Sequence, residues 1–277
     1  MAKADLRELL RAKPQDGRFR MADVDTSSRP GLKRKSGMGN RKLVALQEEL
    51  FELHERLYAE RRRSLLVVLQ GMDTSGKDGT ITHVMRSFNP EGVLITSFKA
   101  PTPQERRHGF LWRIKRRLPA VGEIGIFNRS HYEDVLIARV HELAPAAVID
   151  RRYGEINKFE KDLVRHGTTI VKLCLHISYK EQRKRLLERL KDPDKNWKFN
   201  PHDIDERGFW DDYMSAYGLA ITRCSTAWAP WYVVPADDKD YRNWAVTMIL
   251  LATLRQMDPK YPHPKLNIPV LKRRLQA

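Results

Sequence analysis

The stretch LLVVLQGMDTSGKDGT, residues 65–80, determines the fold. Its first half is a run of apolar and β-branched residues that predicts a buried strand, and the residues after Lys77 can continue as a helix. Strand, Gly-x-x-x-x-Gly-Lys and helix together are the context of a phosphate-binding loop, because glycines let successive N–H groups point at one anion. The helix N-terminus and Lys77 add positive charge. The candidate phosphate-binding residues here are Gly71, Thr74, Ser75, Gly76, Lys77, Asp78, Gly79 and Thr80.

Two acidic residues distinguish this loop from the usual pattern. Asp78 follows the lysine, where a Ser or Thr hydroxyl commonly binds Mg²⁺, and Asp73 lies inside the loop. A carboxylate there repels phosphate unless it binds a cation or takes a proton. We therefore expect Asp73 to be a Mg²⁺ ligand, a general base, or both. The alternative is a glycine-rich turn whose lysine is merely solvated.

The charge of the chain indicates a polyanionic partner. The 277 residues carry a formal net charge of +16, and 31% are charged against 41% hydrophobic. Nucleic acid, anionic lipid and a polyphosphate-type substrate all fit this charge. The two cysteines, Cys174 and Cys224, indicate no disulfide framework, and no apolar run is long enough for a membrane span. We expect a cytoplasmic protein with no membrane partner.

The chain divides into three parts. Residues 1–39 are predicted to be a partly irregular extension with a basic stretch through Lys33 and Gly37, 40–258 the main domain, and 259–277 an extended proline-containing tail. Strands near 65–69, 93–98, 124–127, 168–177 and 231–234 alternate with helices. This alternation predicts a three-layer α/β/α sandwich with a mainly parallel sheet, whose ligands bind at the carboxyl ends of the strands.

A second cluster follows the strand at 124–127. Asn128 occupies the place where many phosphate-loop enzymes carry an Mg²⁺-binding Asp, and Glu133 and Asp134 can supply the missing charge. Arg129 can bridge phosphate oxygens with its fork of donors. A surface salt bridge is the alternative role for Arg129, while His131 and the tyrosine after it are expected to be a packed, hydrogen-bonded pair.

A third cluster lies on a basic helix that begins near residue 180. Arg185 and Arg189 are four residues apart and share one face. With the loop that follows, to about residue 207, this helix is predicted to close over phosphates as a lid, and a solvated charged face is the alternative. The aromatic residues of the next helix, Tyr213 and Tyr217 among them, are predicted to form a core stripe.

Several segments together resemble the polyphosphate kinase 2 family. They are VVLQGMDTSGKDGT at 67–80, Pro101-Thr102 with Arg106, FNRSHYED at 127–134, Asp192-Pro193 with Asn196-Trp197-Lys198, and Ser225-Thr226 with APWY at 229–232. The similarity covers roughly residues 47–254, and its motifs agree in order.

The resemblance implies reversible transfer of the terminal phosphoryl group of inorganic polyphosphate to a nucleotide, with Mg²⁺ or Mn²⁺ as cofactor. It also implies a thymidylate-kinase-like fold with a helical lid and a homo-oligomer, dimer or tetramer. By motif match Asp73 is the essential carboxylate, Lys77 and Arg129 bind phosphate, and Arg185 and Arg189 belong to the lid. Asn128 with Glu133 is similar to the class III subgroup, which accepts both AMP and ADP. The implied nucleotide-binding residues are Asn128, Glu133, Thr102 and Arg106, the implied metal ligands are Asp73 and Glu133, and the implied catalytic residues are Asp73, Lys77, Arg129 and Glu133.

The basic composition agrees with this implication, because a channel for polyphosphate must itself be positive. Adenine nucleotides are the expected acceptors, with guanine nucleotides as further candidates. An ATP-dependent nucleotide or nucleic-acid kinase is one alternative, and a non-catalytic nucleic-acid-binding protein is another. The scarcity of aromatic residues among the basic runs disfavours the latter, so no nucleic-acid partner is expected.

Overall fold

A five-stranded parallel sheet forms the centre of the computed structural model, which describes residues 5–32 and 40–276. The strand order is β2-β3-β1-β4-β5, which places β1, the strand before the phosphate loop, in the middle. The strands span β1 Ser64–Gln70, β2 Val93–Ser97, β3 Ile124–Asn128, β4 Thr168–His176 and β5 Trp231–Pro235. The predicted strands and the α/β fold class are therefore confirmed.

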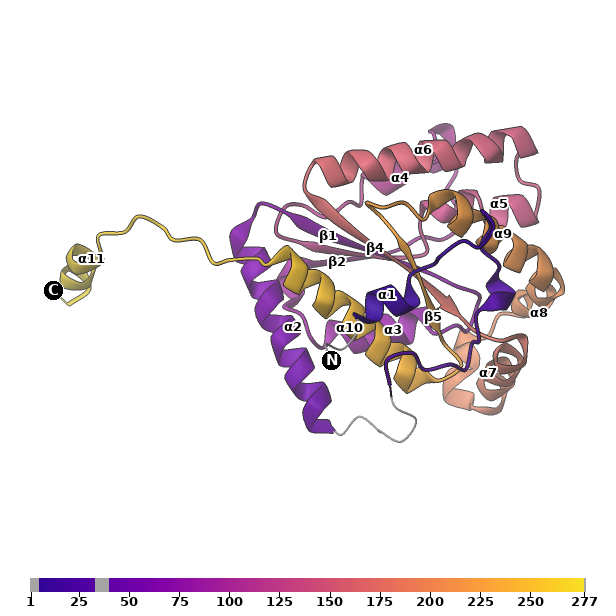
Figure 1. Cartoon of the computed structure of the whole chain (residues 1–277), viewed down its shortest axis with the longest axis horizontal. Helices are drawn as coiled ribbons and strands as arrows, with labels where there is room; N and C mark the ends of the chain where they lie inside the picture. Colours follow the sequence, from indigo (N-terminus) through magenta and orange to yellow (C-terminus); the bar gives the residue numbers. More distant parts are fainter. Residues whose placement is uncertain (1–4, 33–39, 277) are drawn as a thin grey trace.

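Helices cover both faces of the sheet (Figure 1). One face packs against α1 (Leu6–Leu10), α2 (Asn40–Glu60), α3 (Lys77–Met85) and α10 (Lys239–Met257). The other packs against α4 (Trp112–Lys115), α5 (Ile137–Val140), α6 (Ala146–Arg165) and α9 (Trp210–Cys224). The result is the predicted three-layer sandwich with a hydrophobic core on each side of the sheet.

The central strand β1 shows how its sequence builds both cores. Leu65, Val67 and Leu69 belong to the core beside α2 and α10, whereas Leu66 and Val68 belong to the core beside α6 and α9. Successive side chains of a strand point to opposite faces, so a continuous apolar run is what a strand buried on both sides requires. The whole of β1 is buried.

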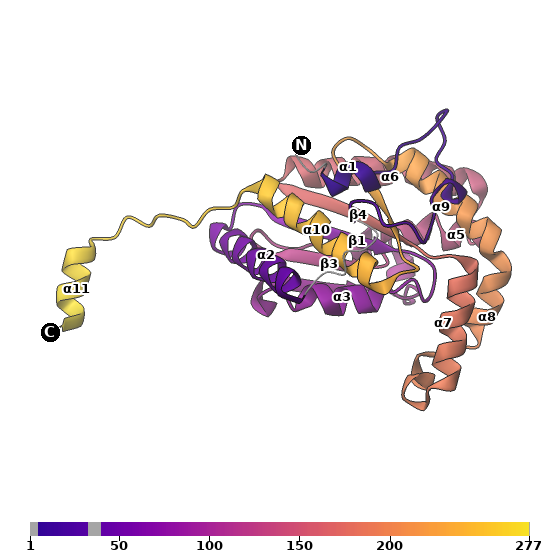
Figure 2. The same ribbon diagram turned by 60° about the horizontal axis from the view of Figure 1, so that its bottom comes forward.

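The helix α7 (Tyr179–Lys191) and the short helix α8 (His202–Glu206) form an arm that projects from the body (Figure 2). A 3₁₀ segment, Pro193–Lys198, connects them. Ser178 caps α7 by accepting a hydrogen bond from the backbone N–H of Glu181. The arm begins directly after β4 and occupies the part of the chain that the sequence predicts to be the lid.

The N-terminal extension is partly irregular, as predicted, and residues 5–32 pack against the body of the protein. Leu6 and Leu10 of α1 are buried, and the backbone N–H of Ala12 donates to the Trp231 carbonyl oxygen of β5. Further along, Tyr241 donates its hydroxyl hydrogen to the carbonyl oxygen of Pro30. The segment therefore covers the β5 edge of the sheet, where unpaired backbone groups would otherwise remain. Its basic stretch at 33–37 lies outside the described residues.

The prediction of a wholly extended C-terminal tail is wrong for its last residues. The chain has no helix or strand over 258–267, and then forms α11, Ile268–Gln276. Ile268, Leu271 and Leu275 fall at helical spacing on one side of α11, which is the pattern that the proline-rich composition concealed. In the described part of the chain, no helix is long and apolar enough to span a membrane.

Two neighbouring leucines test whether the N-terminal segment contributes to stability. Leu10 is buried at 5% exposure and Leu9 is 49% exposed. We expect Leu10→Ala to lower the free energy of unfolding by about 2–5 kcal/mol, since it leaves a cavity between α1 and the core. Leu9→Ala, the matched control, should change it by less than about 0.5 kcal/mol in urea denaturation. Equal small effects for both variants would mean that the segment is detached.

Candidate functional site

The loop between β1 and α3 has the backbone of an anion cradle. Gly71, Thr74 and Gly76 all have positive φ, at 153°, 65° and 100°. Close packing also requires a glycine at position 71, because a Cβ there would lie 2.6 Å from the Leu175 carbonyl oxygen. Thr74 carries a Cβ, and a left-handed backbone conformation is therefore strained at this residue. Strain of this kind is found at functional sites. Lys77 donates through Nζ to the Gly71 carbonyl oxygen at 2.7 Å.

Three hydroxyl groups of this region are buried without a hydrogen-bond partner in the described structure. They are Thr74 Oγ1, Ser75 Oγ and Thr80 Oγ1. Buried polar groups are normally paired, and an unpaired group costs free energy. Their grouping around one loop is what a site built for phosphate oxygens requires, and it supports the predicted phosphate-binding role of this segment.

Asp73 forms an ion pair with Arg129 across the mouth of the loop. Arg129 Nη2 lies 3.0 Å from Asp73 Oδ1, and each side chain is more than a third exposed. Burial opposes ionisation of Asp73, but the charges of Lys77 and Arg129 outweigh it and hold its pKa below the ordinary value. Burial likewise lowers the pKa of Lys77, while Asp73 opposes that shift. The carboxylate is therefore stabilised in its charged form by the cations that would bind phosphate.

Arg129 reaches Asp73 because strands β1 and β3 are neighbours. Leu69 pairs with Asn128 in the parallel register, and the backbone N–H of Arg129 donates to the Leu69 carbonyl oxygen. Arg129 itself has a φ of 63°, a second left-handed non-glycine residue at this site. Asn128 Nδ2 donates to Asp78 Oδ1 at 2.6 Å, which ties the end of β3 to the first turn of α3.

Glu133 lies on the 3₁₀ turn His131–Asp134, just beyond Arg129. Its Oε1 accepts a hydrogen bond from Gln70 Nε2 at 2.8 Å, so the end of β1 orients this carboxylate. Behind the turn, His131 and Tyr132 are completely buried and both contact Glu160. The predicted packed pair is therefore confirmed.

The buried ion pair behind this turn has no counterpart in the sequence prediction. Lys172 Nζ donates to Glu160 Oε2 at 2.6 Å and to the Tyr132 hydroxyl at 2.8 Å. All three side chains are 2% exposed or less, and buried charges persist only where they are paired. The only sequence signal was a charged residue, Lys172, inside an otherwise apolar strand.

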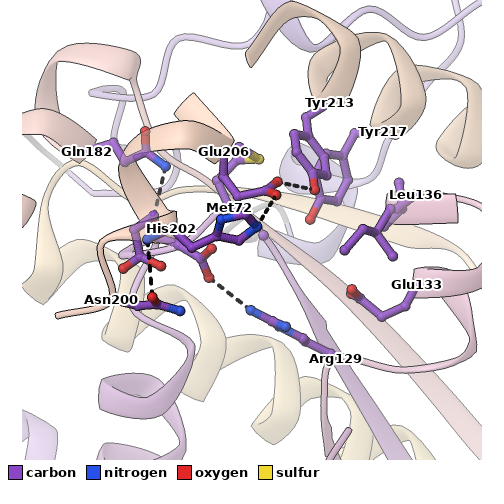
Figure 3. Close-up of a pocket in the computed structure, with 14 residues that line it drawn as sticks. Met72, Arg129, Glu133, Leu136, Gln182, Asn200, His202, Glu206, Tyr213 and Tyr217 are labelled. Atoms are coloured by element: carbon purple, nitrogen blue, oxygen red, sulfur yellow. Dashed lines mark hydrogen bonds and ion pairs between the residues drawn. The ribbon is translucent and has the colours of Figure 1, made fainter. Parts of the chain in front are cut away.

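A pocket opens in front of the ion pair, beneath the projecting arm. Figure 3 shows Arg129 and Glu133 from the β3 side and Tyr213 and Tyr217 from α9 converging on it. Its lining residues are Gly71, Met72, Asp73, Arg129, Glu133, Leu136, Ile137, Gln182, Asn200, His202, Asp203, Glu206, Tyr213 and Tyr217. The two tyrosines were predicted as core; they are buried and also form a wall, since Tyr213 donates to Glu206 Oε2 at 2.6 Å.

Some of the predicted site residues lie away from this pocket. Thr102 and Arg106 are exposed on the loop after β2. Thr102 forms a capping box with Glu105, each backbone N–H donating to the other's side chain, and Arg106 Nε donates to the Pro101 carbonyl oxygen. Their nucleotide-binding role therefore remains a prediction from the motif.

The two lid arginines differ in their surroundings. Arg189 lies 3.5 Å from Asp203 Oδ2, and its charge contributes to the lowered pKa of Asp73. Arg185 is buried, and its guanidinium contacts backbone carbonyl groups of the phosphate loop instead of the pocket. The two arginines therefore differ in their contacts although they were predicted to share one face. Arg185 lies behind the loop, whereas Arg189 pairs with Asp203, a residue that lines the pocket.

The carboxylates of the pocket suit a divalent cation that is also held by substrate. Across residues 5–32 and 40–276, no three His, Cys, Asp or Glu side chains form a complete metal site. Mg²⁺ typically uses one or two protein carboxylates, with water and substrate phosphates as its other ligands. Asp73 and Glu133 both line the pocket, and the donor set fits such a shared site.

Comparison with known proteins agrees with this geometry. Residues 33–262 match the family model described as Polyphosphate kinase 2. The chain is 47% identical over 250 residues to the AMP/ADP-polyphosphate phosphotransferase of Meiothermus ruber, covering 90% of this chain and 94% of the relative. It is 45% identical over 227 residues to the ADP-polyphosphate phosphotransferase of Rhodopseudomonas palustris, covering 78% of each. The crystal structure of polyphosphate kinase 2 from Arthrobacter aurescens TC1 superposes with a TM-score of 0.94, at 45% identity, over 99% of this chain and 97% of that one.

The unpaired hydroxyl groups give a direct test of the anion cradle. We expect Ser75→Ala to reduce the rise in melting temperature caused by inorganic tripolyphosphate, without lowering the melting temperature of the ligand-free protein, because Ser75 Oγ has no partner to lose. Ser64→Ala is the matched control: Ser64 Oγ shares a 3.0 Å hydrogen bond with Thr168 Oγ1. It should cost about 1 kcal/mol of stability and leave the ligand effect unchanged. If Ser64→Ala reduced the effect of tripolyphosphate and Ser75→Ala did not, the anion would bind away from this loop.

Proposed function

Since this chain belongs to the polyphosphate kinase 2 family and is a polyphosphate-dependent nucleotide kinase, we propose that it phosphorylates both AMP and ADP at the site of Asp73 and Arg129. The terminal phosphoryl group of polyphosphate is transferred to the acceptor's terminal phosphate oxygen, and a shortened polyphosphate leaves. The reverse transfer uses the same site.

One observation carries this assignment of the site: a carboxylate lies inside an anion cradle and is held in its charged form. Asp73 has a lowered pKa, caused by Lys77 and Arg129 against the effect of burial. In a turn with only a structural role, the strained backbone, the unpaired hydroxyl groups and the carboxylate among them would each lower stability without any compensating benefit. A site for phosphate together with a divalent cation requires all of these features.

In phosphoryl transfer the protein mainly positions the reactants and neutralises charge. Lys77 and the N-terminus of α3 are placed to hold phosphate oxygens, and Arg129 to stabilise the charge that develops on the transferring group. Asp73 and Glu133 are the proposed ligands of Mg²⁺, which when bound supplies charge neutralisation between donor and acceptor phosphates. Asp73 also orients Arg129 through their 3.0 Å ion pair.

Two observations support the proposal that both AMP and ADP are accepted: the residues at the end of β3 and the names of the relatives. Asn128 and Glu133 are the proposed nucleotide-side residues, and Asn128 carries no charge to repel a second phosphate. The relative from Meiothermus ruber is named for both AMP and ADP, and that from Rhodopseudomonas palustris for ADP alone. We infer that this chain accepts both, with adenine nucleotides preferred over guanine nucleotides, and that it acts as a homo-oligomer.

The function is tested by incubating AMP or ADP with polyphosphate and Mg²⁺, with no ATP added as donor. We expect ADP and ATP to form, and Asp73→Asn to abolish their formation while the far-ultraviolet circular dichroism is unchanged, since an amide cannot supply the negative charge. Asp162→Asn, on the half-exposed outer side of α6, is the control and should be fully active. Near-normal activity of Asp73→Asn would remove its assigned role, and product formation only with ATP as donor would contradict the donor assignment.

Glu133 is tested by the ratio of the rates with AMP and with ADP. Removing its charge should change the AMP:ADP preference several-fold, because the two acceptors differ by one phosphate. We compare Glu133→Ala with Glu133→Gln, which keeps an acceptor for the Gln70 hydrogen bond. If both variants shift the ratio alike, charge sets the preference. An unchanged ratio in both leaves the nucleotide-side assignment without support.

A further inference from the structure

Two buried arginines lie against the outer side of the phosphate loop. Arg185 of α7 is 5% exposed and Arg242 of α10 is 4% exposed. Arg185 Nη1 donates to the Thr74 carbonyl oxygen at 3.0 Å and to that of Ser75 at 3.5 Å. Arg242 Nη1 donates to the same Ser75 carbonyl oxygen at 3.2 Å. Two successive peptide groups of the loop are thus held by two guanidinium groups from different helices.

Fixing these two carbonyl groups fixes the N–H groups of Ser75, which donates to the Met72 carbonyl oxygen at 3.0 Å, and of Gly76. A peptide unit is planar and trans, so its C=O and N–H point in opposite directions. When the Ser75 carbonyl oxygen is held toward the arginines, the N–H of Gly76 must point away from them. The Thr74 carbonyl oxygen belongs to a residue at a φ of 65°, a backbone state that persists only where its surroundings impose it.

The absence of a side chain at Gly76 leaves room for the guanidinium group of Arg242. A Cβ at Gly76 would lie 1.9 Å from Arg242 Nη1, so the guanidinium is packed directly against this glycine. The positive φ of Gly76, 100°, is therefore only one reason for a glycine at this position. Burial and the charge of Arg185 lower the pKa of Arg242 to about 10, which still leaves Arg242 cationic at neutral pH. Their charge also favours an anion bound on the far side of the loop.

Arg185 connects the loop to two further segments. Its Nη2 donates to the carbonyl oxygens of Ala236 at 2.7 Å and Asp237 at 2.8 Å, just after β5. The side chain of Asp237 accepts hydrogen bonds from Thr26 Oγ1 of the N-terminal segment and from the backbone N–H of Ser178, the cap of α7. The guanidinium group of Arg185 therefore joins the loop and the arm to the end of β5, and the Asp237 carboxylate joins the N-terminal segment to the same point.

We propose that Arg185 and Arg242 are positioning residues that hold the phosphate loop in its anion-binding conformation from behind, without contacting the substrate. This inference rests on the proposed function of the loop as the phosphate site. It assigns a role to Arg242, which no sequence motif indicated. For Arg185 it also proposes a different role from the predicted closure over phosphates: this residue attaches the arm to the loop.

Lysine substitutions test the proposal, because lysine keeps the positive charge but cannot hold two carbonyl groups with a planar fork. We expect Arg185→Lys and Arg242→Lys each to weaken the binding of inorganic tripolyphosphate by about tenfold or more, the size typical for loss of a charged hydrogen-bond donor. Binding is measured by titration calorimetry well below the melting temperature of each variant. Turnover should fall at least as much, and should remain low at saturating substrate.

The matched control is Arg63→Lys. Arg63 also donates to a backbone carbonyl oxygen, that of Met257, but lies far along the sheet from the loop. It should leave tripolyphosphate binding and turnover unchanged. Wild-type binding in both loop variants would overturn the proposal, as would a loss of the same size in Arg63→Lys. If either loop variant fails to fold, the other carries the test alone.

The binding measurement separates this inference from the proposed function. If the wild-type protein binds tripolyphosphate but transfers no phosphoryl group, the function fails and the role of the two arginines is still decided by the binding data. If the wild-type protein transfers phosphoryl groups and the lysine variants bind and react normally, the function stands and the inference fails.

Discussion

The ion pair between Asp73 and Arg129 is the interaction on which the site depends. It joins a carboxylate inside the phosphate loop to the guanidinium group of the residue that directly follows β3. The two groups lie 3.0 Å apart, although the residues are 56 positions apart in the sequence. Burial opposes both charges, but Lys77 and Arg129 lower the pKa of Asp73, and Glu133 and Asp73 raise that of Arg129. A negative charge can therefore remain beside a phosphate site and be available to a cation.

The parallel sheet makes this pairing possible. The paired register of Leu69 and Asn128 brings the ends of β1 and β3 to the same edge, and the residues that follow must then turn sharply. The strain of those turns is concentrated in two non-glycine residues with left-handed backbones, Thr74 and Arg129. Thr74 is supported from behind by the buried guanidinium group of Arg185, and the turn that follows Arg129 is packed against the Glu160–Lys172 ion pair through Tyr132.

The sequence was sufficient for what depends on local pattern. Apolar runs located the five strands, and the spacing of glycines and Lys77 located the tight turn between β1 and α3 that we propose as the anion cradle. It could not show which face of a helix packs inward. Arg185 and Arg189 have identical spacing signals, yet one is buried behind the loop. Nor could the sequence show that the N-terminal segment packs on the body, since its few apolar residues gain their partners from distant elements such as β5 and α10.

The most direct test of the account is a crystal of the protein with ADP, a short polyphosphate and Mn²⁺ in place of Mg²⁺, examined by anomalous scattering. The account predicts a manganese peak at coordination distance from an Asp73 carboxylate oxygen, with phosphate oxygens completing its shell and the Ser75 hydroxyl bonded to phosphate. A metal bound elsewhere, with Asp73 contacting only Arg129 while both substrates are in place, would contradict it.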